Sequence, residues 1–136
     1  MIAAGTTIML VGATRVFVPQ DLEFIRATRD AVSAINAHLL PLIAHDRAGF
    51  GGALVSCGLA MFLSVLYGMP SRNLWQALVI AGLFGFSTAI GIHPAIGYLS
   101  VSHLAPAVFG ALVFAIGLAM TYGRVKSEER RVKREE

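Results

Sequence analysis

The residues in this chain that could do chemistry form two short groups between long apolar runs. One group lies in GIHPAIGYLSVSHLAP, residues 91–106, which holds two histidines and no Asp, Glu, Lys or Arg. The other lies in IAHDRAGFGGAL, residues 43–54. The candidate ligand or cofactor residues are His45, Arg47, His93 and His103, and the supporting polar residues are Arg15, Asp46 and Tyr98. Antiparallel helices would bring all seven to one end of a bundle.

Several kinds of site fit these side chains. Histidine can ligate haem iron or chlorophyll magnesium, or donate a hydrogen bond to a quinone oxygen. His45, Asp46, His93 and His103 have acceptable chemistry for a divalent metal, but no histidine pair with i, i+4 spacing supports one, so we assign no metal. The preferred interpretation is a structural network, for example an ion pair between Arg15 and Asp46.

The elements that position these residues are apolar runs. Charged residues make up 14% of the 136-residue chain, against about 25% in an average soluble domain. A helix needs about 20 mainly apolar residues to cross a bilayer. The predicted spans are residues 1–18, 48–69, 74–92 and 104–123, and the last three contain no charged residue. We therefore predict an all-α, single-domain protein, residues 1–136, folded as a transmembrane bundle of about four helices.

The segment of residues 19–47 is predicted to be a connector that carries one amphipathic helix. Apolar or small residues recur at helical spacing along one face: Ile25, Thr28, Val32, Ile35 and Leu39. Pro19 and Pro41 would bound this helix, and Asp21 is a suitable N-cap. Such a helix would lie flat at the membrane interface or against the bundle.

The tail, residues 124–136, fixes the expected orientation. Six of the eleven Lys and Arg residues lie in it: Arg124, Lys126, Arg130, Arg131, Lys133 and Arg134. The positive-inside rule then places the tail in the cytoplasm, with the bacterial inner membrane as the expected location. Four crossings would put the N-terminus on the same side. Because the tail also holds acids, it indicates a solvated helix end that could touch anionic lipid, and nucleic acid is not an expected partner.

Small residues recur every fourth position in the spans, which favours close packing of membrane helices. The predicted packing residues are Gly52, Ser56, Ala60, Ser64 and Gly68, then Ala81, Gly85 and Ala89, then Ala111 and Ala115. His93 and His103 continue two of these rows at the predicted helix ends.

Catalysis is not favoured. Cys57 is the single cysteine, so a dithiol centre within the chain is impossible. No HExxH or GxSxG pattern occurs, and the last three spans lack the carboxylate that a proton-coupled carrier usually needs.

Three strings resemble those of small bacterial membrane proteins with four hydrophobic helices: GATRVFVPQDLEFI, LIAHDRAGFGG and HPAIGYLSVSHLAPA. The resemblance implies a four-helix membrane fold and carries no established activity, so it assigns no catalytic residue.

Two functions follow from the sequence. The first is a non-catalytic subunit that packs against other membrane protein subunits in a larger complex. The alternative is a binder of a small amphipathic ligand or cofactor, such as a quinone, lipid, haem or chlorophyll, at the end rich in His, Arg and Asp.

Overall fold

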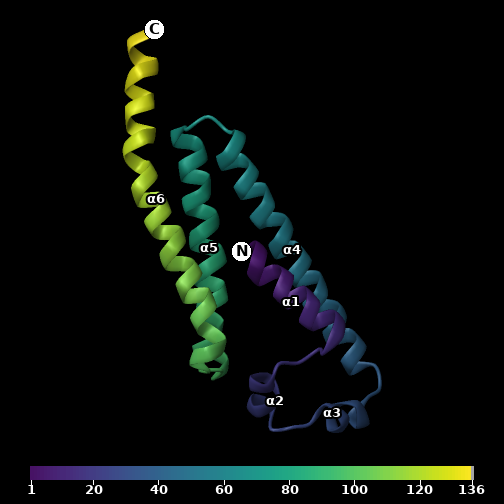
Figure 1. Cartoon of the computed structure of the whole chain (residues 1–136). Coiled ribbons are helices and arrows are strands. Elements are labelled where there is room, and N and C mark those ends of the chain that lie inside the picture. The colour runs from purple at the N-terminus through teal and green to yellow at the C-terminus, as the bar shows by residue number, and fades with distance from the viewer. Residues whose placement is uncertain (136) are drawn as a thin grey trace. The chain divides into compact units, whose positions relative to one another are not determined.

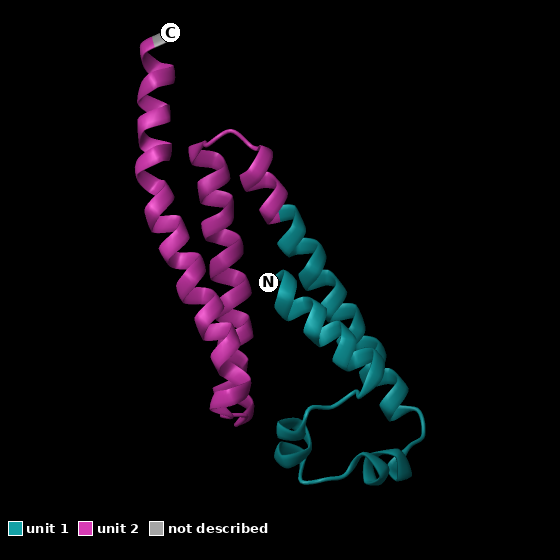
Figure 2. Ribbon diagram, in the orientation of Figure 1, with its two compact units in different colours: residues 1–60 teal, residues 61–136 magenta. Residues whose placement is uncertain are grey.

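The structure, a computed structural model, describes residues 1–135, and these residues form helices and no strand. In chain order the helices are α1 (Ile2–Thr14), α2 (Pro19–Ile25), α3 (Arg29–Ile35), α4 (Leu39–Tyr67), α5 (Arg72–Ile96) and α6 (Val101–Glu135), as Figure 1 shows. They form two compact units, Met1–Ala60 and Met61–Glu136, and α4 runs from the first into the second (Figure 2). The all-α prediction is confirmed.

Three helices in the described residues are long and apolar enough to cross a membrane. They are Leu39–Tyr67, Arg72–Ile96 and Val101–Arg134, and each contains most or all of one predicted span. Helix α4 has 29 residues, which corresponds to about 43 Å at 1.5 Å per residue. Because the hydrocarbon core is about 30 Å thick, both ends of α4 cannot lie inside it unless the helix tilts.

The first predicted span differs from the structure. The helix expected over residues 1–18 ends at Thr14 and has 13 residues, about 20 Å, which is too short to cross alone. Val16 then adopts a left-handed backbone conformation with φ of 67°, and the chain turns into α2. Helices α1 and α2 make an angle of 66°, so a fourth span exists only if this bent pair counts as one.

The predicted connector helix is divided into two short helices. Arg26, with φ of 51°, ends α2 in the left-handed region. Thr28, expected on an apolar face, instead caps α3, because its hydroxyl accepts a hydrogen bond from Ala31 N at 3.1 Å. Asp21 is not the N-cap residue but lies inside α2, where its carboxylate accepts from Val18 N at 3.0 Å. Pro41 falls in the first turn of α4, where the missing amide hydrogen is harmless.

In the first unit, α1 and α4 pack backbone against backbone through glycines. An ideal Cβ on Gly5 would lie 2.7 Å from the carbonyl oxygen of Gly51, and one on Gly12 would lie 2.8 Å from Ala48 N. A Cβ on Gly58 would lie 2.8 Å from the side chain of Ile2. These distances are shorter than van der Waals contact, so the observed approach requires glycine.

In the second unit, α5 and α6 pack aromatic rings onto glycines. The Phe114 ring lies directly over Gly82, and the Phe86 ring lies 3.4 Å from where a Cβ of Gly110 would be. The centroids of the Phe86 and Phe114 rings are 5.6 Å apart. Figure 1 shows the two helices side by side, joined by a short turn.

Few apolar side chains are buried in the described residues, and many large ones are exposed. Val16, Val32 and Val125 are buried, whereas Phe84 is 72% and Phe109 70% exposed. Soluble proteins rarely expose extensive apolar surface of this kind. The surface of these long helices is compatible with a membrane protein.

Candidate functional site

The most extensive set of side-chain contacts involving a charged group in the first unit surrounds Arg47. Its guanidinium lies 2.6 Å from the carboxylate of Asp21, which is 6% exposed. It also donates to the carbonyl oxygen of Val16 at 2.8 Å and lies 5.7 Å from the centroid of the Phe17 ring. One side chain of α4 therefore holds the turn after α1 and the start of α2.

This arrangement changes the interpretation of the predicted polar residues. The expected pair of Arg15 and Asp46 is not among the ion pairs of residues 1–135; Asp46 instead lies 3.2 Å from His45. His45 and Asp46 are both well exposed, at 83% and 71% of their side chains. Arg47, predicted as a ligand residue, contacts Asp21 through Nη2 and donates to Val16 through Nη1. These contacts are structural, and a ligand role for Arg47 stays a prediction.

In the second unit, His93, Tyr98 and His103 lie together at the turn between α5 and α6. The ring centroids are 5.4 Å apart for the two histidines, and 4.7 Å apart for Tyr98 and His103, which are stacked. Gly97, with φ of 74°, makes this possible because it ends α5 in the left-handed region. Tyr98 N then donates to the carbonyl oxygen of His93 at 2.9 Å, a Schellman-type cap.

One atom of this cluster is unusual. Nδ1 of His93 is buried and has no hydrogen-bond partner in the structure. A buried polar atom without a partner is uncommon in folded proteins and calls for an explanation. Pro94 lies within α5, so this helix continues past the predicted span of residues 74–92 and ends at Ile96. No group of three or more His, Cys, Asp or Glu suited to a metal ion is found in the part of the chain that the structure describes.

Most residues of the predicted packing rows take no part in the close contacts within each unit. Gly52 and Gly85 would each meet nothing within 4 Å if they carried a Cβ. The glycines in close contact are their neighbours, Gly51 one position earlier and Gly82 three positions earlier. Ser56, Ala60, Ser64, Gly68 and Ala115 are exposed, and Ala81, Ala89 and Ala111 are half-buried.

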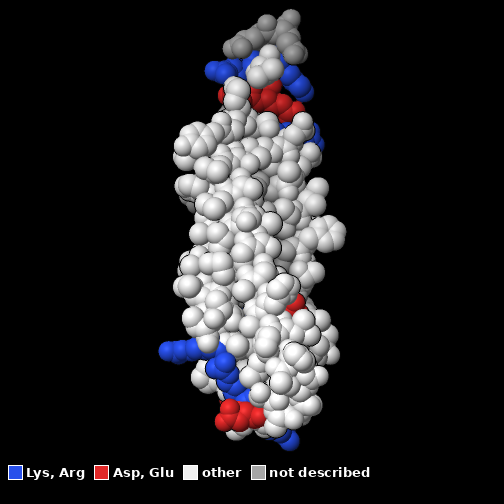
Figure 3. All heavy atoms as spheres, turned by 90° about the vertical axis from the view of Figure 1, so that its right-hand side faces the viewer, with Lys and Arg blue, Asp and Glu red and all other residues white. Residues whose placement is uncertain are grey.

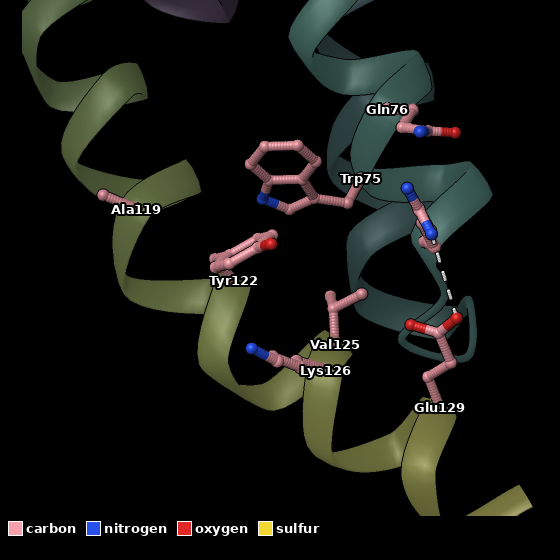
Figure 4. Close-up of a pocket in the computed structure, with 8 residues that line it drawn as sticks. Trp75, Gln76, Ala119, Tyr122, Val125, Lys126 and Glu129 are labelled. Carbon is pink, nitrogen blue, oxygen red and sulfur yellow. Dashed lines mark ion pairs between the residues drawn. The ribbon is translucent and has the colours of Figure 1, made fainter. Parts of the chain in front are cut away.

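A groove at the opposite end of α5 and α6 was not predicted. It has a volume of about 650 Å³ and is lined by Arg72, Trp75, Gln76, Ala119, Tyr122, Val125, Lys126 and Glu129 (Figure 4). Trp75 Nε1 donates to the carbonyl oxygen of Leu118 at 3.0 Å, and the rings of Trp75 and Tyr122 are 5.2 Å apart. The sequence contains one feature that could have indicated this groove: a Trp and a Tyr stand beside basic residues at the ends of two apolar runs.

Comparisons with protein-family models, with curated proteins and with solved structures found no match to this chain.

Proposed function

We propose that the chain is a non-catalytic integral membrane subunit that packs against and stabilises a larger protein complex in the bacterial cytoplasmic membrane. Support for insertion comes from three long apolar helices with exposed large side chains. The Lys and Arg residues of the tail gather at the end of α6, as Figure 3 shows, and by the positive-inside rule this end would be cytoplasmic.

The observation that carries the proposal is a second set of small residues that takes no part in the close contacts within either unit. Close contact within each unit depends on Gly51 and Gly82, while Gly52 and Gly85 face open space. A lipid-facing position tolerates a large side chain, whereas a helix from another subunit approaches closely only over small residues. We therefore assign the faces around Gly52 and Gly85 to partner helices.

The test compares neighbouring glycines. Gly52→Leu and Gly85→Leu should release the tagged full-length protein from its complex, so that its native mass in mild detergent falls to that of the free chain. Their helical content should stay as in the wild type, and their melting temperature should not fall, because leucine favours the helix over glycine. The matched variants Gly51→Leu and Gly82→Leu should instead lower the melting temperature, because their side chains would enter an occupied contact.

Two results would reject this function. One is a wild-type chain that runs as a free protein after gentle extraction. The other is a complex that keeps its full mass in both Gly52→Leu and Gly85→Leu.

A second candidate function, binding of a small amphipathic ligand at the His93–Tyr98–His103 turn, is favoured by the unpartnered Nδ1 of His93. An imidazole N–H of this turn would donate to a quinone carbonyl or a lipid oxygen, and an imidazole nitrogen without a proton would bind the metal of haem or chlorophyll. An absorption spectrum and mass spectrometry of an organic extract test this binding. A ligand that co-purifies with the wild type and is absent from His93→Ala would favour this function, and a wild type that carries no ligand would exclude it.

A further inference from the structure

The groove between α5 and α6 combines an apolar aromatic wall with cationic side chains. Its wall is made by Trp75, Tyr122 and Ala119, and its charged lining consists of Arg72, Lys126 and Glu129 (Figure 4). We propose that this groove binds one anionic phospholipid. Arg72 and Lys126 supply the positive charge for the headgroup phosphate, and an acyl chain covers the aromatic wall.

The aromatic wall is held in place by contacts within the unit. The indole N–H of Trp75 is committed to the carbonyl oxygen of Leu118, so the ring presents its apolar surface to the groove. The Tyr122 ring lies 5.2 Å from it at 53°. Ala119, about one turn before Tyr122 on α6, also lines the groove. Trp and Tyr prefer the level of the lipid headgroups and glycerol, which is where such a groove is needed.

The cations are available to a phosphate. Arg72 is 67% exposed at its side chain, and its Nη1 lies 4.0 Å from Glu129, a distance beyond hydrogen-bonding range. The carboxylate of Glu129 is also 3.8 Å from Lys133, so its charge is shared between two loose partners. An arginine in this state can bind a phosphate with two parallel hydrogen bonds, and Lys126 adds a second positive charge.

The position of the groove favours a lipid over a soluble anion. It lies where the uncharged part of α6, up to Gly123, gives way to the basic tail. A free phosphate would leave the wall of Trp75 and Ala119 uncovered, whereas a phospholipid covers the wall and the charged lining together. Basic residues next to a membrane-spanning helix attract anionic lipids of the cytoplasmic leaflet. The inference rests on membrane insertion in the proposed function, and it needs no partner subunit.

Trp75 is the only tryptophan, so the groove contains its own reporter. The full-length chain is placed in phosphatidylcholine vesicles that contain phosphatidylglycerol with brominated acyl chains, because bromine quenches indole fluorescence at contact. Brominated phosphatidylcholine at the same mole fraction measures non-selective lipid contact. The experiment is run at about 1 M salt, where the Debye length of about 3 Å removes diffuse attraction by the tail.

We expect phosphatidylglycerol to quench Trp75 at a several-fold lower mole fraction than phosphatidylcholine. Arg72→Gln and Lys126→Gln should each remove most of this preference, because each takes away one of the two cations that contact the phosphate. Arg130→Gln with Arg134→Gln removes as much charge from the tail outside the groove and should leave the preference unchanged. Lys126 makes none of the ion pairs found in residues 1–135, so Lys126→Gln tests binding with little risk to the fold.

Equal quenching by the two lipids would overturn the proposal. So would a preference that survives Arg72→Gln with Lys126→Gln, or one that is lost equally in Arg130→Gln with Arg134→Gln. Because the assay uses the isolated chain, its failure would leave the subunit function standing. Failure of the Gly52→Leu and Gly85→Leu experiment would likewise leave the lipid site standing.

Discussion

The two helix pairs of this protein use glycine in different ways. Between α1 and α4, the glycines Gly5 and Gly51 bring backbone against backbone. Between α5 and α6, the space over Gly82 is filled by the ring of Phe114. A backbone cannot move without distorting its helix, whereas a ring can change its rotamer. The first pair should therefore be the more easily broken by added atoms, and the second the more adaptable.

The polar contacts also make the α1–α4 pair the more easily broken of the two. The α1–α4 unit contains an ion pair between Arg47, which is partly buried, and Asp21, which is buried, and Arg47 also donates to the carbonyl oxygen of Val16. The α5–α6 unit is joined by a neutral hydrogen bond, from the Trp75 indole to Leu118. Removal of one partner from a buried ion pair costs far more than loss of a neutral hydrogen bond.

The largest effect is expected from Arg47→Ala. Asp21, 6% exposed, would lose the guanidinium that compensates its charge, and the free energy of unfolding should fall by about 3–5 kcal/mol. Thermal unfolding in mild detergent, followed by circular dichroism, measures this loss. Asp21→Asn in the Arg47→Ala protein should restore part of it, because the buried charge is then removed.

The control for this prediction is Arg72→Ala. Arg72 is exposed and its ion pair is long, so the change should be within about 0.5 kcal/mol. If Arg47→Ala and Arg72→Ala melt at the same temperature, the ion pair of the first unit does not hold it together.

An intermediate effect is expected from a single methyl group at the contact glycines. Gly51→Ala would place its Cβ 2.7 Å from the carbonyl oxygen of Gly5 and should cost about 3 kcal/mol. Gly82→Ala should cost about 1 kcal/mol, because the Phe114 ring can move and alanine favours the helix. The same melting experiment separates the two.

Gly52→Ala and Gly85→Ala are the matched controls for these substitutions. Their added methyl groups meet nothing within 4 Å. The free energy of unfolding should therefore rise by the full gain in helix propensity, about 0.8–1 kcal/mol. A Gly51→Ala protein as stable as Gly52→Ala would contradict the close approach of α1 and α4.

The smallest effect is expected from Trp75→Phe, which keeps an aromatic ring and removes the donor to Leu118. The loss should be about 1 kcal/mol, as for one neutral hydrogen bond. Circular dichroism is the readout, since this variant lacks tryptophan fluorescence. Tyr122→Phe keeps the ring contact and should change the free energy of unfolding by less than about 0.5 kcal/mol. An equal loss of stability in both variants would contradict a contribution from the indole hydrogen bond.

The sequence predicted the three long helices because a run of 20 apolar residues has few stable alternatives. It did not predict that the first helix ends at Thr14. A hydropathy profile does not report backbone conformation, so it gave no sign of the left-handed conformation of Val16. The turn at Val16 is held by Arg47, which lies 31 residues further along the chain. The division of the connector at Arg26 was missed for a similar reason, since its apolar periodicity continues through the break.

Some parts of the candidate sites were predicted from the sequence and others were not. His93, Tyr98 and His103 are close in the sequence around one turn, and the structure brings their rings together. The pair of Arg47 with Asp21 and the groove at Trp75 join residues 26 and 43–57 positions apart, so no local pattern marks them. That the seven predicted polar residues meet at one end of a bundle stays a prediction.

The glycines separate what the sequence determined from what only the tertiary structure decided. Composition alone determined that small residues would line the helices of an apolar, helical protein. A step of four residues drifts round a helix, whereas Gly5 with Gly12 and Gly51 with Gly58 are seven apart and stay on one face for two turns. Which face makes the contact depends on the direction from which the partner helix approaches. That direction is a property of the packed pair and cannot be read from either helix alone.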